Sequence, residues 1–247
     1  PIKKINEGFV YSRPMKEKEK NIFSEPLPKN QNYSDVLLKI LGHENVASRA
    51  PVYECYDKNV QGRVVVERGQ ANAGVVAPFD SEKYPEEIKD DCFSATLSHN
   101  PAIGKIDSFL VAQYAVLEAC ARTVSVGATP VALTDCLCFG NPEKPEQMWQ
   151  FAQSCLAIRE TCDLLHFDGL KNLPIVAGNV SFYNQGGGQS IPASPMIGCF
   201  GKITKVGLLK NDFQNSGSNI FLVGGQHSSI GGGVVCDVLN IKNTLII

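Results

Sequence analysis

An apolar run that breaks into a polar turn and restarts with helical spacing constrains this chain more than any other stretch. Residues 130–137 are mostly apolar, with Asp135 as a polar interruption, and this predicts a strand covered on both faces. The Gly-Asn-Pro run at residues 140–142 ends the strand, because proline lacks a ladder donor and glycine and asparagine favour turn dihedrals. The structural interpretation of Asp135 and Asn141 is that they shape this turn.

A long helix is expected directly after the turn. Pro145 suits a first helical turn, and apolar residues then recur at helical spacing to form one buried face. This face contains Met148, Phe151, Ala152, Cys155, Ile158, Cys162 and Leu165.

The remaining patterns predict an α+β (α/β-like) class, with a mixed β-sheet and helices packed on one face. Further helices are expected at residues 34–41, capped by Ser34 and Asp35, at residues 49–56, and in a long segment capped by Asp107. Strands are expected at residues 62–66, 69–77, 93–97, 174–178 (buried), 196–203 and 220–225.

Charge and apolar runs exclude several classes of protein. The net charge is −2, which gives no electrostatic reason to expect nucleic acid or an anionic membrane as a partner. No apolar run approaches the ~20 residues of a membrane span, and no secretory signal pattern opens the chain. A cytoplasmic protein is expected.

The sequence is rich in cysteine, but the spacing of the cysteines is typical of neither a disulfide framework nor a metal site. The nine cysteines include Cys136 and Cys138, two residues apart, but no Cys-x-x-Cys occurs. Most lie in apolar patterns, so they are interpreted as reduced core residues, and neither a disulfide framework nor a metal site is expected.

Several longer motifs carry a resemblance to a known family. Residues 134–146, 178–184 and 191–195, supported by residues 52–62 and 100–107, resemble in sequence and in order the phosphoribosylformylglycinamidine synthases, amidotransferases of purine biosynthesis. The resemblance covers roughly residues 53–233 and is to the second of that family's two homologous halves, within the aminoimidazole ribonucleotide synthetase superfamily. It implies an ATP-dependent ligase that converts formylglycinamide ribonucleotide to its amidine with ammonia from glutamine.

The polar, charged composition of the N-terminal segment, together with the resemblance, predicts how the chain divides. Residues 1–50 are expected to be a linker or extended arm with a short helix, residues 51–213 a synthetase-type domain, and residues 214–247 the start of a truncated C-terminal companion domain. The chain begins at Pro1 and ends in an apolar tail, so it is interpreted as a piece of a larger protein.

The expected nucleotide site departs from the family pattern. Relatives carry an aspartate where this chain has Asn72, and a glutamate and an asparagine four residues apart where it has Glu118 and Arg122. Mg²⁺ prefers carboxylates, so the metal site in which Glu118 would be the ligand is weakened, and an ion-paired Glu118 is the favoured interpretation. Arg122 keeps an alternative role, in which its guanidinium donates two hydrogen bonds to a phosphate without a metal.

By the same resemblance, the other cleft residues are expected to be Asp135, Asn141, Asn179 and Ser181. The family's catalytic histidine belongs to the first half, so no catalytic residue is assigned and the piece alone is expected to be inactive. ATP or ADP with Mg²⁺ are the family's cofactors, and their binding by this piece is not expected.

Glycine-rich stretches add two weaker alternatives. Residues 185–189 predict either a hairpin tip or backbone amides that approach an anion. Residues 227–233, with Ser228 and Ser229, offer a second phosphate-binding interpretation.

The expected partners follow from the resemblance. They are the homologous first half, whose sheet would pair with this one into a barrel-like dimer, a C-terminal domain, and a glutaminase domain or subunit; an isolated piece would pair with itself. Two other functions stay open: a free-standing ATP-binding relative, kinase-like or hydrogenase-maturation-like, and a scaffold or regulatory module without a ligand.

Overall fold

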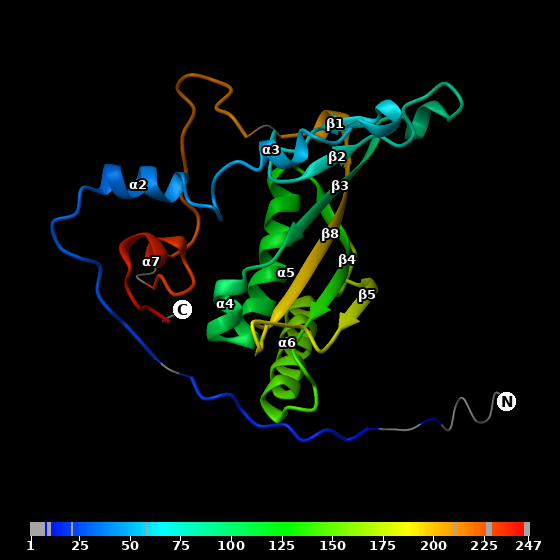
Figure 1. Ribbon diagram of the computed structural model, residues 1–247. Coiled ribbons are helices and arrows are strands. Elements are labelled where there is room, and N and C mark those ends of the chain that lie inside the picture. Colours follow the sequence, from blue (N-terminus) through cyan, green and yellow to red (C-terminus); the bar gives the residue numbers. More distant parts are fainter. Residues whose placement is uncertain are drawn as a thin grey trace.

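A six-stranded mixed sheet forms the centre of the molecule (Figure 1). The computed structural model describes residues 8, 11–20, 22–57, 59–209, 211–225 and 229–244. In spatial order the strands are β1 (Val64–Val66), β2 (Gly74–Val76), β3 (Asp91–Ser98), β8 (Ser194–Thr204), β4 (Thr129–Cys138) and β5 (Ile175–Ser181). Strands β4 and β5 are parallel and all other neighbours are antiparallel, which confirms the predicted mixed sheet.

Helices cover one face of this sheet, as predicted. Helix α5 (Ser108–Ser125) packs against β3, β8 and β4, and α6 (Pro145–Leu164) packs against α5. The short helix α4 (Pro101–Ile106), capped by the Asn100 side chain, leads into α5. The main core lies between these layers, and Val111, Leu133 and Ile197 are fully buried in it.

Alternation along β8 shows why one face is buried. Ile197, Cys199 and Ile203 are buried, whereas Phe200 and Lys202, between them, are exposed. A Cβ on Gly201 would lie 2.5 Å from the Thr123 methyl carbon of α5, so glycine at this position lets the helix approach the strand.

Asp107 caps α5, as predicted. Its Oδ1 accepts hydrogen bonds from the N–H groups of Phe109 and Leu110 at 2.8 and 3.0 Å, and Lys20 Nζ lies 2.5 Å from Oδ2. Burial raises the pKa of Asp107, but the Lys20 ammonium and the two N–H donors outweigh it and hold this pKa below its ordinary value. The N-terminal arm is thereby tied to the start of α5.

The other face of the sheet is open, and this corrects two predictions. In β4, Thr134, Cys136 and Cys138 are only half-buried, so the strand is covered on one face rather than both. The second correction concerns β5, which was predicted as a buried strand from the apolar run at residues 174–178. It is an exposed edge strand, because it pairs only with β4 and no described element covers it.

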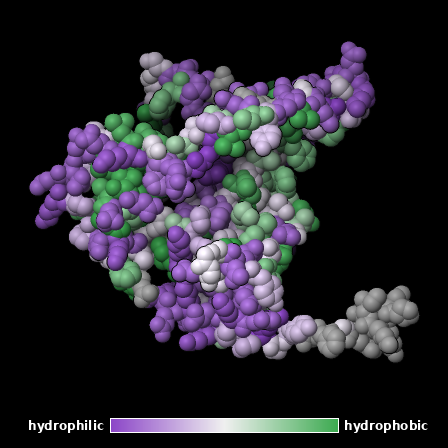
Figure 2. Space-filling view, viewed as in Figure 1, coloured by the Kyte–Doolittle hydropathy of each residue, from purple (hydrophilic) through white to green (hydrophobic). Residues whose placement is uncertain are grey.

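Outside the sheet, the predicted element ends need correction. Helix α2 (Tyr33–Leu41) is capped by Asn32, whose Oδ1 accepts from Ser34 N at 3.1 Å, and not by Ser34 or Asp35. Helix α3 (Ala50–Tyr53) is shorter than expected, and α7 (Val234–Leu239) was not predicted. Helices α2 and α7 pack together, and Figure 2 shows apolar surface beside the polar residues of α2.

The strand predicted at residues 220–225 is wrong. These residues form no regular structure, and Ile220 to Val223 are exposed, because no strand in the described ranges pairs with them. The prediction of a hairpin at residues 185–189 is confirmed by β6 (Gln185–Gly186) and β7 (Gln189–Ser190). His227 and Ser228 lie outside the described residues.

The described chain also contains 3₁₀ turns at Val60–Gly62, Glu86–Ile88 and Lys205–Gly207. Among the described residues, no helix combines the length and apolar character that a bilayer span requires.

Candidate functional site

The flank of α5 brings Glu118 and Arg122 together as an ion pair. Arg122 Nη2 donates to Glu118 Oε1 at 2.7 Å, and Arg122 Nη1 donates to the Leu97 carbonyl at 3.0 Å. The Ser98 hydroxyl donates to Glu118 Oε2. The predicted i,i+4 pair is therefore confirmed, and both carboxylate oxygens of Glu118 already have a partner in the protein.

Asn72 joins the same group from the loop before β2. Its Nδ2 donates to Ser125 Oγ at 3.3 Å, and Ser125 Oγ donates to the Arg122 carbonyl at 2.7 Å. A continuous chain of contacts thus runs from Ser98 through Glu118 and Arg122 to Asn72. The structure therefore places all three expected metal-ligand positions on this flank of α5. Glu118 keeps the carboxylate of the family pattern, whereas Asn72 and Arg122 depart from it.

Tyr114 is a further polar partner of Glu118, and His99 lies just after the end of β3. Burial and the adjacent Glu118 carboxylate raise the pKa of Tyr114, one turn earlier in α5. Burial lowers the pKa of His99, which follows β3, so its ring is neutral near pH 7, and Nδ1 lies 3.2 Å from the Pro195 carbonyl oxygen that it bonds.

Sequence reasoning missed Ser98 and Tyr114 as partners of Glu118. The signal for Tyr114 was its spacing of four residues from Glu118 on one helix. Ser98 offers no such signal, because its contact with Glu118 depends on how β3 packs against α5.

This group does not fit Mg²⁺. The ion prefers carboxylate oxygens together with phosphates and water, but Arg122 occupies the only carboxylate of the group and Asn72 directs its amide nitrogen to Ser125. Across the part of the chain that the structure describes, no three His, Cys, Asp or Glu side chains lie close enough to hold a metal.

Asp135 lies in the middle of β4 and faces the helices. Its Oδ1 would be 2.7 Å from a Cβ on Gly178, and its carboxylate accepts a hydrogen bond from the Asn179 N–H. Burial raises the pKa of Asp135 despite this bond. The interpretation of Asp135 as a turn residue is wrong, because the strand continues through Cys138.

The other three predicted cleft residues lie at the ends of β4 and β5. Asn141 shapes the turn, as its structural interpretation predicted, since its Oδ1 accepts from Glu143 N at 2.8 Å. The Ser181 hydroxyl oxygen accepts from Asn184 Nδ2 at 3.1 Å, which closes the next loop. Asn179 lies on the open face, where its Nδ2 donates to Cys136 Sγ at 3.6 Å.

Strand β8 lies between the Glu118 group, which includes Ser98 of β3, and Asp135 of β4. Ser98 of β3 and Asp135 of β4 both pair with Ile197, from opposite sides. They therefore share the helix-facing side of the sheet, roughly 10 Å apart across two strand spacings. The residues predicted for a single cleft are divided, because Asn179 is on the opposite face of the same sheet.

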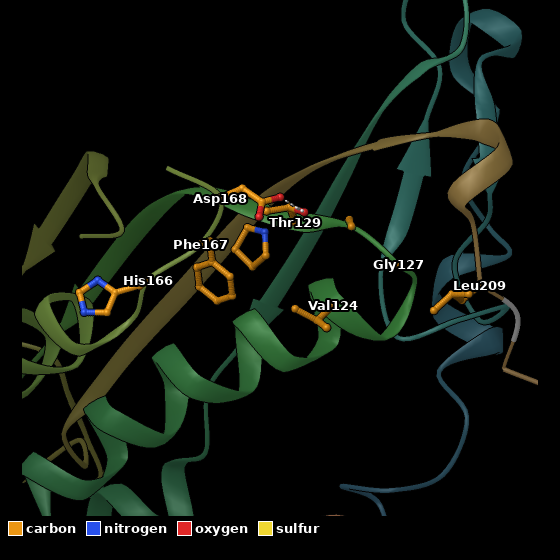
Figure 3. A pocket seen from close by; sticks show the side chains of 9 residues that line it. Val124, Gly127, Thr129, His166, Phe167, Asp168 and Leu209 are labelled. Atoms are coloured by element: carbon orange, nitrogen blue, oxygen red, sulfur yellow. Dashed lines mark hydrogen bonds between the residues drawn. The ribbon is translucent and has the colours of Figure 1, made fainter. Parts of the chain in front are cut away.

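A hollow of ≈ 430 Å³ lies beyond the C-terminal end of α5 (Figure 3). Thr129 Oγ1 lies 3.5 Å from Asp168 Oδ2, the contact drawn as a dashed line, while His166 and Leu209 lie at opposite sides of the view. Its other walls include Val124 and Phe167. None of the predicted site residues lines this hollow.

Comparison with known proteins agrees with the fold. The family described as AIR synthase related protein, N-terminal domain, matches residues 71–203. A protein of Methanothrix thermoacetophila named phosphoribosylformylglycinamidine synthase subunit PurL is 34% identical over 235 residues, which is 94% of this chain and 30% of that protein. Its namesake from Carboxydothermus hydrogenoformans is 35% identical over 227 residues, 91% of this chain and 29% of that protein. The chain thus spans less than a third of the length of these curated relatives.

Solved structures give the same result. Thermotoga maritima PurL complexed with ADP is 26% identical with a TM-score of 0.54, over 78% of this chain and 29% of that one. The PurLQS structure from the same organism, with a TM-score of 0.56 and 23% identity over 81% of this chain and 29% of that one, supports the fold alone. The matched residues 71–203 include the sheet from β2 to β8, except the last residue of β8, and every residue predicted for the site. The chain therefore belongs to the AIR synthase related family.

Proposed function

We propose that this chain contributes a synthetase-type domain to a phosphoribosylformylglycinamidine synthase of purine biosynthesis. That enzyme would use ATP and ammonia from glutamine to convert formylglycinamide ribonucleotide to its amidine. Support comes from the curated relatives of that name at 34% and 35% identity. Thermotoga maritima PurL, solved with ADP and with AMPPCP at 26% and 25% identity, adds a nucleotide-binding relative.

Within that enzyme, we assign this domain a supporting rather than a catalytic role. Phosphoryl transfer depends on positioned cations that neutralise developing charge. The single observation that carries the assignment is the Glu118 carboxylate, whose two oxygens bind Ser98 and Arg122. An engaged carboxylate beside a guanidinium has little affinity for a divalent cation, so the domain supplies shape and contacts.

Calorimetric titration with ADP tests this role. We expect the heat of ADP binding, if any is measured, to be the same with Mg²⁺ and with EDTA, because no free carboxylate is available to bridge the ion to the nucleotide. Tight binding that requires Mg²⁺ would contradict the supporting role and favour a free-standing ATP-binding relative. A chain that fails to assemble with any part of the synthase would instead favour a scaffold.

The open sheet face is the surface through which this domain would meet a homologous sheet. Val76 pairs with Phe93, and Ala95 with Phe200, so these side chains share that face with Leu97. Their exposed fractions of 40%, 43%, 37% and 61% for Val76, Phe93, Phe200 and Leu97 leave apolar side chains facing solvent. Burial of such a face is favourable, and we propose that the first synthetase half covers it in a barrel-like pair.

Sedimentation of the isolated chain tests this pairing. At high concentration we expect a self-paired dimer that Leu97→Asp with Phe200→Asp converts to a monomer, because each buried charge would lack a partner. Leu38→Asp, on the exposed side of α2 at 67% exposure, is the matched control and should leave the dimer intact. A wild-type monomer across the whole concentration range would contradict the pairing.

The remaining parts of the proposal concern segments and partners outside this domain. We propose the division into an arm at residues 1–50, the domain at residues 51–213 and the start of a companion domain at residues 214–247. A C-terminal domain and a glutaminase domain or subunit would complete the enzyme, in the cytoplasm. The curated relatives at 34% and 35% identity are each named subunit PurL, and this supports an enzyme of more than one subunit.

A further inference from the structure

Sulfur atoms gather at one place on the open sheet face. Cys136 and Cys138 alternate with Asp135 and Leu137 along β4, so both thiols lie on that face, and their Sγ atoms are 3.8 Å apart. Met196 of β8 is the register partner of Cys136. Directly opposed residues of an antiparallel pair share a face, so the Met196 side chain lies on the same face as the two thiols, next to Cys136.

The separation of the thiols suits a chelated cation. Two metal–sulfur bonds of about 2.3 Å, at tetrahedral to trigonal angles, place the sulfur atoms about 3.8–4.0 Å apart. A disulfide suits this pair less well, because residues two apart in a strand have Cα atoms about 6.6 Å apart, near the upper limit of about 6.8 Å for a disulfide. All three sulfur-bearing residues are half-buried, so a cation has access to them while the open face is unpaired.

The neighbouring groups select the kind of cation. On the same face the register partners of the two cysteines in β5 and β8 are Asn179, Ser181 and Ser194, besides Met196. Asp135 faces the helices instead, and among the described residues no third His, Cys, Asp or Glu joins the pair. Zn²⁺ normally requires four nitrogen, sulfur or carboxylate ligands, whereas thiolate and thioether ligands select Cu(I).

We propose that Cys136, Cys138 and Met196 form a binding site for Cu(I), held by two thiolates and one thioether. Each thiol releases its proton to solvent when the ion binds, copper stays in the Cu(I) state, and the site carries one net negative charge. The Asn179 amide already donates to Cys136 Sγ at 3.6 Å, which stabilises the thiolate. This inference does not depend on the proposed synthase function.

Anaerobic titration of the full chain with Cu(I), in competition with a chromophoric Cu(I) chelator, tests the site. We expect one tightly bound Cu(I) that Cys136→Ser or Cys138→Ser weakens by more than about 100-fold, and Met196→Leu by about tenfold, because a lost ligand costs at least as much as a lost outer-shell partner. Cys55→Ser and Met148→Leu are the matched controls, at an exposed thiol and at a half-buried thioether of α6, and should not change the affinity.

X-ray absorption of the Cu(I)-loaded wild-type chain gives a test that needs no variant to fold. A coordination shell of sulfur alone is expected. A shell containing nitrogen or oxygen, unchanged affinity in both serine variants, or tighter binding of Zn²⁺ than of Cu(I) to these residues would overturn the proposal.

Discussion

Phe139→Ala is expected to lower the free energy of unfolding by about 3–5 kcal/mol. The Phe139 side chain is fully buried, and its ring makes an edge-to-face contact with Phe151 at 5.4 Å between centroids. Phe151 contacts Phe182 in the same way at 4.9 Å. Removal of the ring leaves a cavity between β4 and α6 that rigid secondary structure cannot fill.

The same substitution should loosen the turn that contains Asn141. The Phe139 carbonyl accepts from Asn184 N at 3.1 Å, and the Gly140 carbonyl accepts from Tyr183 N at 3.1 Å, so the ring anchors both loops at this end of the sheet. Faster amide hydrogen exchange at Tyr183 and Asn184 is the expected local sign.

Urea unfolding followed by circular dichroism measures the effect. Phe213→Ala is the matched control, because the Phe213 side chain is 86% exposed. This substitution should change the free energy of unfolding by less than about 0.5 kcal/mol. Phe139→Leu should cost less than the alanine substitution, since it keeps much of the buried volume. Equal losses in Phe139→Ala and Phe213→Ala would contradict the assigned packing.

Local signals predicted the covered face of the fold well. The Asp107 cap and Pro145 placed the starts of α5 and α6, because caps and first-turn prolines act within a few residues. The apolar run at residues 196–203 likewise predicted the strand β8. Each of these features depends on residues close together in the sequence, so it can be predicted without knowing the tertiary contacts.

The errors concern which segment covers an apolar run. Residues 130–137, 174–178 and 220–223 all carry apolar runs, and in this structure one has an open face, one is an exposed edge and one has no strand partner among the described residues. An apolar run predicts that something covers it but not whether this chain supplies the cover. A homologous sheet and a companion domain, as proposed above, would account for these three errors.

The same distinction applies to the candidate site. The Glu118–Arg122 pair was predictable because spacing on a helix fixes it. The contact of Glu118 with Ser98, and of Asn72 with Ser125, joins residues 20 and 53 positions apart, and no local pattern encodes it. Asp135 was misassigned because the polar residue interrupts an apolar run without ending the strand.

Asn72→Asp combined with Arg122→Asn is expected to create Mg²⁺-dependent binding of ADP. The first change adds a carboxylate in place of an amide, and the second removes the guanidinium that occupies Glu118 Oε1. Asn72 contacts Ser125, whose hydroxyl donates to the Arg122 carbonyl, so the added carboxylate would lie on the same flank of α5 as Glu118. Mg²⁺ binds through one or two carboxylates together with phosphate oxygens and water.

Calorimetry with ADP should then show binding at least about tenfold tighter in Mg²⁺ than in EDTA, the equivalent of about 1.4 kcal/mol. Adding Glu118→Gln to the double variant is the matched control, because it keeps the size of the side chain and removes the charge that the metal requires. The double variant should keep a wild-type circular dichroism spectrum, since Asn72 is exposed and the Arg122–Glu118 pair is only partly buried. If the folded double variant binds ADP equally well with and without Mg²⁺, the Glu118–Arg122 ion pair is not what distinguishes this domain from a nucleotide-binding relative. The proposed supporting role would then need another physical cause.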